Sequence, residues 1–295
     1  ILLLKKLIVS KRAPRALGSL TMIENIDFYC TSHKNVDYLD DFKILTLIGC
    51  GEKEFSPKWK FFNNKSNINH KFVAYADLTA QYSVWKNIIK NDLKADKWIS
   101  FSQYRRHWLN EKFNPNKQYK LNDLRNIILQ SPRENWKNFD AILTTPFVFK
   151  KRFFERIKNF NFNEKKSIKD QFLESIGDNS KNILFKILEK LPPKISYDFL
   201  EYMSQNNTLS AHGMYISKPN IFNEYFTLIF DWFEKCEDIV GVSGEMKLGK
   251  QPRFFQYLNE RFSDFWFKKN TKYTTNPICM YNEPLNKITL VGKII

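Results

Sequence analysis

The chain has 295 residues, of which 43% are apolar, so it can bury a sizeable core as one large domain or two small ones. Its formal net charge of +16 favours polyanionic partners such as nucleic acid, anionic lipid or phosphorylated substrates, although a lysine-rich solvated surface gives the same total. The four cysteines are far apart and form no Cys-x-x-Cys pair, which argues against a zinc knuckle or redox pair and favours a reducing compartment.

The first residues, ILLLKKLIV, are interrupted by lysines and fall short of the roughly 20 apolar residues that a membrane-spanning helix needs. No small-x-small cleavage pattern follows them, and Gly18-Ser19 resembles a cloning scar. We therefore assign residues 1–20 to an N-terminal extension or tag and residues 21–295 to a single domain. No other segment is apolar and long enough to cross a membrane.

In the first half of the chain, short apolar segments ending in polar loops alternate with a helical segment. The predicted strands are residues 26–30, 42–48, 98–101 and 140–144. Residues 52–71 are polar and show no period, so we predict a loop, whereas apolar residues recur at helical spacing over 75–89.

The second half is mainly helical. Pro192-Pro193 separates a helix at 180–190 from one at 195–205 within the helical stretch 164–206. A strand is predicted at 211–217, followed by a helix from Pro219 to Cys236 and a last helix from Pro252 to Lys269. The predicted mobile loop between these two helices contains Gly241, Gly244 and Gly249. The alternation of strands and helices predicts an α/β fold with crossover connections.

Polar clusters lie at three predicted strand ends, which is where ligands bind in open α/β sheets. In the cluster QYRRH, Arg105 and Arg106 offer planar donor forks suited to phosphate oxygens, although they also suit a surface salt bridge. The cluster TSHKN contains Thr31, the imidazole of His33 and Lys34; its hydroxyl and backbone groups suit a base and ribose and Lys34 suits a phosphate, but an ordinary polar loop has the same composition.

The third cluster, His212-Gly213, permits close approach of a ligand or, equally, a bulge. Several common motifs are absent from the sequence. It contains no P-loop, Gly-x-Gly-x-x-Gly or His-Glu-x-x-His motif, which argues against nucleotide triphosphatases, dinucleotide-cofactor enzymes and zinc proteases. It also lacks Asp-x-Asp, the pair with which many sugar-nucleotide transferases hold a divalent metal.

Together the clusters resemble a family of bacterial capsular polysaccharide and lipopolysaccharide glycosyltransferases, long known as a domain of unknown function with a His-Tyr-Arg-Arg hallmark. The matching segments are Thr31, His33 and Lys34, the helix ADLTAQYSVWKN at 76–87, QYRR at 103–106, HGMYISKPNIFNEYFTLIFDWF, and Gln251, Arg253, Glu260 and Arg261. The resemblance covers residues 26–268. In this chain Gln103 replaces the hallmark histidine, Asp77 replaces a glutamate, and KSNIN replaces an acidic Gly-Asp-Asn stretch.

This resemblance implies an α/β, GT-A-like fold, with a Rossmann-like mixed sheet flanked by helices. It implies transfer of a sugar from a nucleotide sugar, a UDP-sugar, to a growing capsular or lipopolysaccharide glycan, including lipid-linked acceptors. The nucleotide would lie against the TSHKN loop and the diphosphate near Tyr104, Arg105 and Arg106, with His212 and Gly213 also in the donor site. The protein would be cytoplasmic, and its basic surface suits peripheral contact with the anionic inner face of the membrane.

Sugar transfer places negative charge on the departing diphosphate, which must be stabilised. Without an Asp-x-Asp pair, we predict that Arg105, Arg106 and Lys34 do this without a metal or other cofactor. An inverting enzyme also needs a carboxylate base, for which the candidates are Asp77, Asp231 and Glu260. Asp77 also suits a helix cap, and Glu260 suits an ion pair with Arg253 or Arg261.

Two other classes stay open at the level of sequence. A basic, aromatic-rich protein can bind single-stranded nucleic acid, and a relative with altered hallmark residues can be inactive. The chain has no known nucleic-acid-binding motif, so we expect no nucleic-acid partner.

Overall fold

The computed structural model describes residues 25–51, 54–64, 66–149, 165–177, 180–242 and 252–291. The expected extension at 1–20 lies outside the described residues, as do Gly244 and Gly249 of the expected glycine-rich loop.

A mixed sheet runs through the described chain, and nine of its strands pair in one network. The first part is parallel: β1 (Asn25–Ser32) lies between β2 (Leu45–Gly49) and β3 (Lys97–Gln103). On its other side β3 pairs antiparallel with β8 (Tyr215–Ser217), then β8 pairs with β5 (Ala141–Thr144) and β5 with β9 (Tyr273–Asn276).

A three-stranded extension leaves the end of β3. The chain reverses after Gln103 into β4 (Arg106–Trp108), which pairs with β10 (Ile278–Asn282), and β10 pairs with β11 (Lys287–Val291). A separate small ribbon joins β6 (Phe147–Val148) to β7 (Thr208–Leu209). Strands from both ends of the described chain therefore belong to the same sheet.

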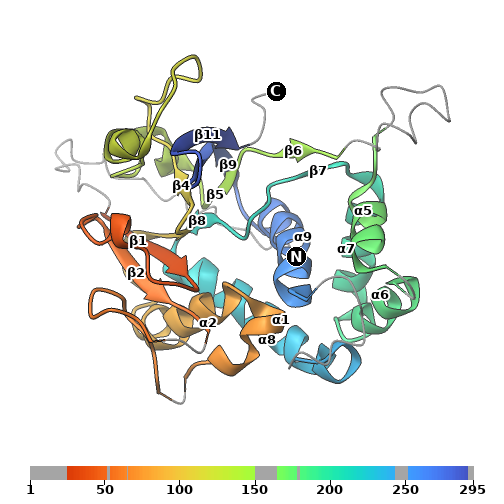
Figure 1. The fold of residues 1–295 in the computed structure, drawn as a ribbon. Coiled ribbons are helices and arrows are strands. Elements are labelled where there is room, and N and C mark those ends of the chain that lie inside the picture. Colours follow the sequence, from red (N-terminus) through yellow and green to blue (C-terminus); the bar gives the residue numbers. More distant parts are fainter. Residues whose placement is uncertain are drawn as a thin grey trace, which may run out of the picture.

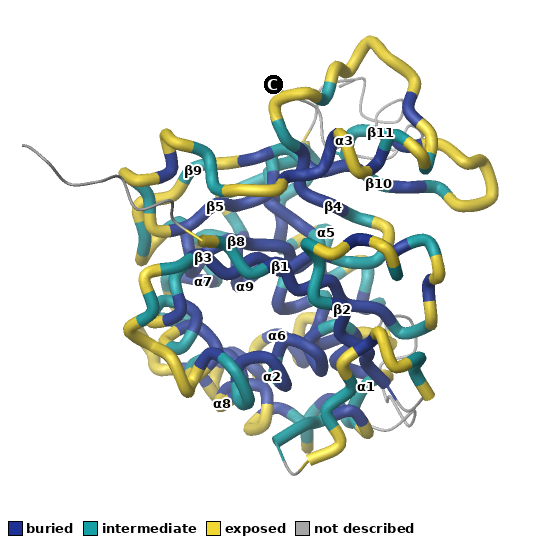
Figure 2. The backbone as a smooth tube through the Cα atoms, turned by 90° about the vertical axis from the view of Figure 1, so that its left-hand side faces the viewer, coloured by how far each residue is buried: buried dark blue, intermediate teal, exposed yellow. Residues whose placement is uncertain are grey.

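The central strands form because their side chains alternate between two apolar layers. Tyr29, Ile99 and Tyr215 belong to one buried cluster, whereas Phe28, Trp98 and Ile216 belong to another on the opposite face. Figure 2 shows these strands as the buried centre of the molecule.

The first of these layers is covered by helices (Figure 1). They are α1 (Phe72–Tyr75), α2 (Leu78–Asn87), α5 (Ile168–Ile176), α6 (Ser180–Leu188), α7 (Pro193–Gln205), α8 (Pro219–Val240) and α9 (Phe254–Asn270). Elsewhere lie α3 (Leu124–Ile127) and 3-10 helices at Asp37–Leu39, Asn69–Lys71, Ile89–Asn91, Leu121–Asp123 and Glu134–Asn138. Trp85, 4% exposed, and Trp98, fully buried, are core residues as expected.

Three predicted elements differ from the structure. The second strand starts at Leu45 and not at residue 42, because Phe42 closes a turn by donating its N–H to the Leu39 carbonyl. The helix at 75–89 is two helices, since Ala76 has a φ of 46° that no α-helix accommodates. The strand at 211–217 is limited to 215–217, because His212 and Gly213 form a turn with φ of 78° and 58°.

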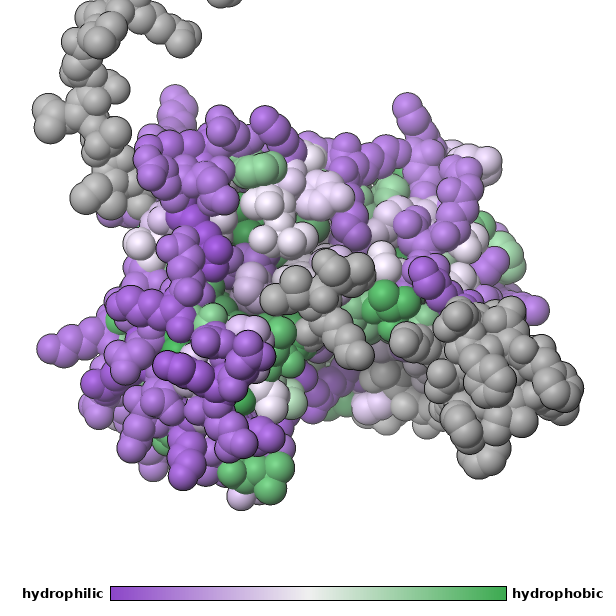
Figure 3. Space-filling view, turned by 90° about the horizontal axis from the view of Figure 1, so that it is seen from above, coloured by the Kyte–Doolittle hydropathy of each residue, from purple (hydrophilic) through white to green (hydrophobic). Residues whose placement is uncertain are grey.

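The helix after Pro219 runs to Val240 and not 236, and the strands β4, β9, β10 and β11 were not predicted. The four cysteines are buried free thiols. The part of the surface coloured in Figure 3 is mostly hydrophilic, with hydrophobic residues in small separate patches. None of the helices among the described residues is both long and apolar enough to cross a bilayer.

Candidate functional site

A cavity of about 300 Å³ lies between the carboxyl ends of β1 and β3 and the first turns of α9; we call it the β3–α9 cavity. It is lined by His33, Phe72, Ala76, Asp77, Gln103, Tyr104, Arg105, Arg106, His212, Arg253, Gln256, Tyr257 and Glu260. The cavity thus lies at the strand ends, where open α/β sheets bind their ligands.

The turn between β3 and β4 supplies the cavity with its arginines. The turn is tied to the sheet because the Tyr104 N–H donates to the Thr31 carbonyl over 3.0 Å. Arg105 is exposed and its guanidinium lies 5.2 Å from the centre of the Tyr104 ring, whereas Arg106 is half-buried. Burial lowers the pKa of Arg106, against the opposing effect of the Glu260 carboxylate, and its Nε has no hydrogen-bond partner among the described residues.

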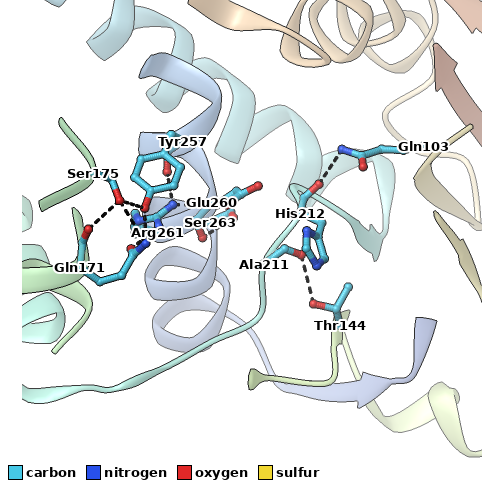
Figure 4. Close-up of polar contacts among 10 residues, drawn as sticks. All are labelled: Gln103, Thr144, Gln171, Ser175, Ala211, His212, Tyr257, Glu260, Arg261 and Ser263. Carbon is cyan, nitrogen blue, oxygen red and sulfur yellow. Dashed lines mark hydrogen bonds and ion pairs between the residues drawn. The ribbon is translucent and has the colours of Figure 1, made fainter. Parts of the chain in front are cut away.

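Gln103 joins three parts of the cavity wall. Its Oε1 accepts a 2.6 Å hydrogen bond from Arg106 Nη1, while its Nε2 donates to Asp77 Oδ2 over 2.7 Å. The same Nε2 donates to the His212 carbonyl over 3.0 Å (Figure 4). A carboxamide that accepts from one neighbour and donates to two others therefore fixes the position of Arg106, Asp77 and the His212 turn.

Asp77 faces the cavity because of the backbone break at Ala76, which separates α1 from α2. Asp77 is the first flanking residue of α2, but its side chain makes no capping hydrogen bond. The cap interpretation is therefore wrong. Burial raises the pKa of the Asp77 carboxyl group, and the charges of Arg253 and Arg106 partly oppose that shift.

One polar face of α9 forms the opposite wall. Arg253, at the N-terminal flank, and Gln256, Tyr257 and Glu260 are spaced i, i+3, i+4 and i+7, so they lie on the same side of the helix. Burial raises the pKa of Glu260, whereas Arg261 and Arg106 oppose the shift. Gln256 and Tyr257 were missed from the sequence, although this spacing between two matched motif residues was a usable signal.

Arg261, which does not itself line the cavity, contacts two of these lining residues, Tyr257 and Glu260. It is 1% exposed, its Nη1 donates to the Tyr257 carbonyl over 2.6 Å, and it also lies 3.3 Å from Glu260 Oε2. Its guanidinium stacks 3.3 Å from the centre of the Tyr257 ring, and its Nη2 donates to Gln171 of α5 (Figure 4). The predicted Glu260–Arg261 ion pair is therefore confirmed, and it belongs to the wall of the cavity.

The TSHKN residues lie in three different settings. Thr31 is buried, and its Oγ1 donates to the Ser102 carbonyl between β1 and β3, so it holds the sheet and does not line the cavity. His33 lines the cavity and contacts the Tyr104 ring edge-on, with centres 5.5 Å apart. Lys34 lies outside the lining, with its ammonium 3.1 Å from Glu283 and 5.5 Å from the centre of the Tyr104 ring.

His212 lines the cavity, and Gly213 lies directly behind it. Burial lowers the pKa of His212 to about 4, so its imidazole is neutral at physiological pH. The Gly213 carbonyl accepts from Gln81 Nε2 over 2.9 Å. The φ of 58° at Gly213 is one that side-chain-bearing residues rarely adopt, so the turn favours glycine, and a Cβ there would also lie 2.6 Å from Gln256 Nε2.

Asp231 is remote from the β3–α9 cavity. It lies on α8 in a second depression of about 270 Å³, the α2–α8 cleft, and its carboxylate pairs with Lys235 over 2.7 Å. The cleft is lined by Ile68, Lys71, Tyr75, Tyr82, Trp85, Lys86, Lys90, Thr227, Phe230, Asp231, Glu234 and Glu237. Of the three carboxylates predicted as a base, the structure thus brings together Asp77 and Glu260 and leaves Asp231 apart.

Among the described residues, no three His, Cys, Asp or Glu side chains are grouped so that they could hold a metal ion. The expectation of metal-independent chemistry remains a prediction.

Comparison with known proteins gives a family and a fold. The model of a domain of unknown function, DUF4422, matches residues 27–271. Among solved structures, the chain is similar to the apo structure of the bifunctional glycosyltransferase WbbM, with 17% identity and a TM-score of 0.63. The likeness covers 92% of this chain and 46% of WbbM, so the chain spans about half the length of that protein. No curated protein matches. The fold is therefore GT-A-like, as the sequence predicted.

Proposed function

The chain belongs to the family defined by the domain of unknown function DUF4422, and from that premise we propose that it transfers a sugar from a UDP-sugar donor to a glycan acceptor. The observation that carries the proposal is the β3–α9 cavity, where Arg105, Arg106 and Arg253 share one space with the carboxyl groups of Asp77 and Glu260. Arginines suit a diphosphate and carboxylates suit an acceptor hydroxyl, so the cavity offers both halves of the reaction. The similarity to WbbM, itself described as a glycosyltransferase, supports this reading.

In this proposal the donor diphosphate lies against the β3–β4 turn. Arg105 is exposed and able to meet an incoming ligand, while the half-buried Arg106 has an Nε that still lacks an acceptor among the described residues. Both guanidinium groups would stabilise the negative charge that develops on the departing diphosphate. Lys34, paired with Glu283 outside the lining, would contribute only through its longer-range field.

Asp77 and Glu260 are the candidates for the base that takes the acceptor proton in an inverting reaction. Because burial raises the pKa of both carboxyl groups, each is a stronger base than an exposed carboxylate. Glu260 faces the donor side from α9, and Asp77 is held by Gln103. The substitutions Asp77→Asn and Glu260→Gln distinguish the two candidates.

The acceptor we propose is a growing capsular or lipopolysaccharide glycan, including lipid-linked forms, handled in the cytoplasm. The net charge of +16 suits docking at the anionic inner face of the membrane. Flotation with vesicles containing anionic lipid tests that contact, and salt-insensitive binding or no binding contradicts it.

Binding of the donor nucleotide is tested by isothermal titration with UDP, with and without EDTA, on the wild type and on Arg105→Ala and Arg106→Ala. We expect UDP affinity to fall by roughly 10- to 100-fold in each variant, since each removes charge-assisted hydrogen bonds to phosphate. Arg125→Ala is the matched control, because that exposed arginine lies 3.7 Å from Asp41 and outside the cavity lining. Equal UDP binding by all four proteins would sink the proposal, and strict manganese dependence would remove its metal-free form.

Product formation separates an active enzyme from an inactive relative. We expect the wild type to hydrolyse a UDP-sugar slowly in the absence of acceptor. If UDP binds normally but no UDP-sugar is hydrolysed or transferred, the replaced hallmark positions, Gln103 above all, point to an inactive binding protein.

A further inference from the structure

The carboxamide of Gln256 is an unpartnered polar group in the wall of the β3–α9 cavity. Gln256 is 7% exposed, and neither its Nε2 nor its Oε1 has a hydrogen-bond partner among the described residues. The other two glutamines nearby are satisfied: Gln103 bonds to Arg106, Asp77 and His212, and Gln81 bonds to Gly213 and Tyr215. Gln256 therefore stands out in this polar wall.

A buried amide without partners destabilises a protein by about 1–3 kcal/mol for each lost group, so such amides are rare unless a ligand satisfies them. Gln256 lies at the cavity surface and on the helix face that also carries Arg253 and Glu260. Both amide atoms are themselves covered in the unliganded protein, so a molecule in the cavity reaches them once the side chain rotates toward it.

The turn at His212-Gly213 leaves the room that this amide occupies. A Cβ at Gly213 would lie 2.6 Å from Gln256 Nε2 and 3.5 Å from Asn259 Nδ2, so a side chain there would displace the amide. The turn is held firmly, because Gln103 donates to the His212 carbonyl and Gln81 to the Gly213 carbonyl. The Thr144 hydroxyl also donates to the Ala211 carbonyl (Figure 4). The fold therefore fixes the turn against which the Gln256 amide packs, while no hydrogen bond among the described residues holds the amide itself.

We propose that Gln256 recognises a hydroxyl group on the sugar ring of the donor, donating through Nε2 and accepting through Oε1. The inference rests on the proposed function and adds to it the group that selects the sugar. A hydroxyl is both donor and acceptor and so satisfies both ends of a carboxamide. A phosphate oxygen only accepts, and it would leave Oε1 unpaired beside a negative charge.

The position of Gln256 distinguishes the sugar from the base of the nucleotide. The rings of His33 and Tyr104 contact each other at the ends of β1 and β3, in the wall opposite α9, and aromatic rings suit a base. Gln256 lies one helical turn before Glu260, whose side chain projects from α9 on the side facing His212 (Figure 4). In the proposed function the reacting sugar lies between the arginines of the β3–β4 turn and the candidate bases Asp77 and Glu260, and Gln256 borders that space.

Gln256→Met tests the proposal, because methionine keeps the length of the side chain and removes the amide. Isothermal titration is run with UDP, UDP-glucose, UDP-galactose and the 2-, 3-, 4- and 6-deoxy analogues of whichever sugar binds more tightly. We expect one deoxy analogue to bind the wild type roughly 10- to 100-fold more weakly than its parent, as expected for a buried hydrogen-bonded hydroxyl. Gln256→Met should bind UDP normally and should no longer distinguish that analogue from its parent.

Thermal unfolding of the unliganded proteins separates this role from a structural one. Because the amide has no protein partner to lose, Gln256→Met should unfold at or above the wild-type temperature. Gln130→Met, on an exposed glutamine outside the cavity lining, is the matched control and should bind every ligand like the wild type. A lower unfolding temperature together with retained sugar discrimination overturns the proposal, as does an equal loss of UDP itself, which would assign Gln256 to the base or phosphates. If the wild type binds neither UDP nor a UDP-sugar, the proposed function fails first and this inference with it.

Discussion

The β3–α9 cavity and the α2–α8 cleft have similar volumes, and α1 contributes to both, yet their polar groups differ in how they are paired. In the cleft two of the carboxylates are in ion pairs: Lys71 lies 2.7 Å from Glu237, which also accepts a 2.6 Å hydrogen bond from the Tyr75 hydroxyl, and Asp231 pairs with Lys235, which lies outside the lining. In the cavity, Arg106 and Gln256 keep unpartnered atoms within the described structure, and two carboxyl groups have raised pKa values. Volume therefore does not distinguish the two regions, whereas the unpartnered polar atoms and the raised carboxyl pKa values do.

The largest expected difference between the two regions is in turnover. Asp77→Asn or Glu260→Gln should reduce sugar transfer by about 10²–10⁴-fold for whichever residue is the base, the range of general base catalysis. Asp231→Asn, in the cleft, should stay within about two-fold of the wild type. Rates of UDP release from the donor in the presence of acceptor measure this. A large loss in Asp231→Asn would reverse the comparison.

The same carboxyl groups link activity to pH. Their pKa values are raised, so the base is protonated and inactive at a pH where an exposed carboxylate is already ionised. The rate of sugar transfer should therefore rise with pH, and the rise should lie above the ordinary pKa values of 3.8 for Asp and 4.5 for Glu. Since the folded pKa is the higher one, ionisation opposes folding, and stability falls as pH rises through that window. Asp77→Asn should thus unfold at or above the wild-type temperature at pH 7. Thermal denaturation of both proteins measures this.

Gly213→Ala should disturb the cavity by straining the backbone turn behind its wall. A φ of 58° is unfavourable for alanine, and its Cβ would push against Gln256. We expect a loss of about 1–3 kcal/mol in the free energy of unfolding, together with weaker UDP-sugar binding. Chemical denaturation and titration measure the two effects. Unchanged stability would show that the turn is free to relax and that the cavity wall is not held as described.

A smaller effect is expected in the α2–α8 cleft. Glu237→Gln removes the charge that Lys71 and Tyr75 share in a half-buried position, so stability should fall by about 1–2 kcal/mol. UDP affinity should not change, because Glu237 is remote from the cavity lining. A fall in UDP affinity would mean that the two regions are coupled through α1.

The smallest expected effect is on the exposed pair Lys235–Asp231. Lys235→Ala should change the free energy of unfolding by no more than about 0.5 kcal/mol, since solvent screens such an i,i+4 pair. Denaturation at low and high salt measures it. A loss above about 1 kcal/mol would mean that the cleft depends on this pair more than its exposure implies.

Much of the site could be predicted from the sequence because its motifs lie at strand ends. The ends of β1 and β3 were found from apolar segments followed by TSHKN and QYRR, and seven of the predicted site residues line the cavity: His33, Asp77, Tyr104, Arg105, Arg106, His212 and Glu260. Thr31, Lys34 and Gly213 lie next to it without lining it. Asp231 lies apart in the α2–α8 cleft, which the sequence did not indicate, because a carboxylate in a helix carries no local sign of which cavity its face meets.

The sequence by itself determined the α/β alternation, the Pro192-Pro193 break and the paired arginines, because local periodicity and backbone sterics decide these. Only the tertiary structure decided that Ala76 breaks a helix, that the turn at 212–213 replaces a strand, and that C-terminal strands complete the sheet. It alone showed Gln103 connecting Arg106 with Asp77, and Gln256 left without a partner among the described residues. Those features depend on contacts between residues that are far apart in the sequence, and such contacts leave no local sequence pattern.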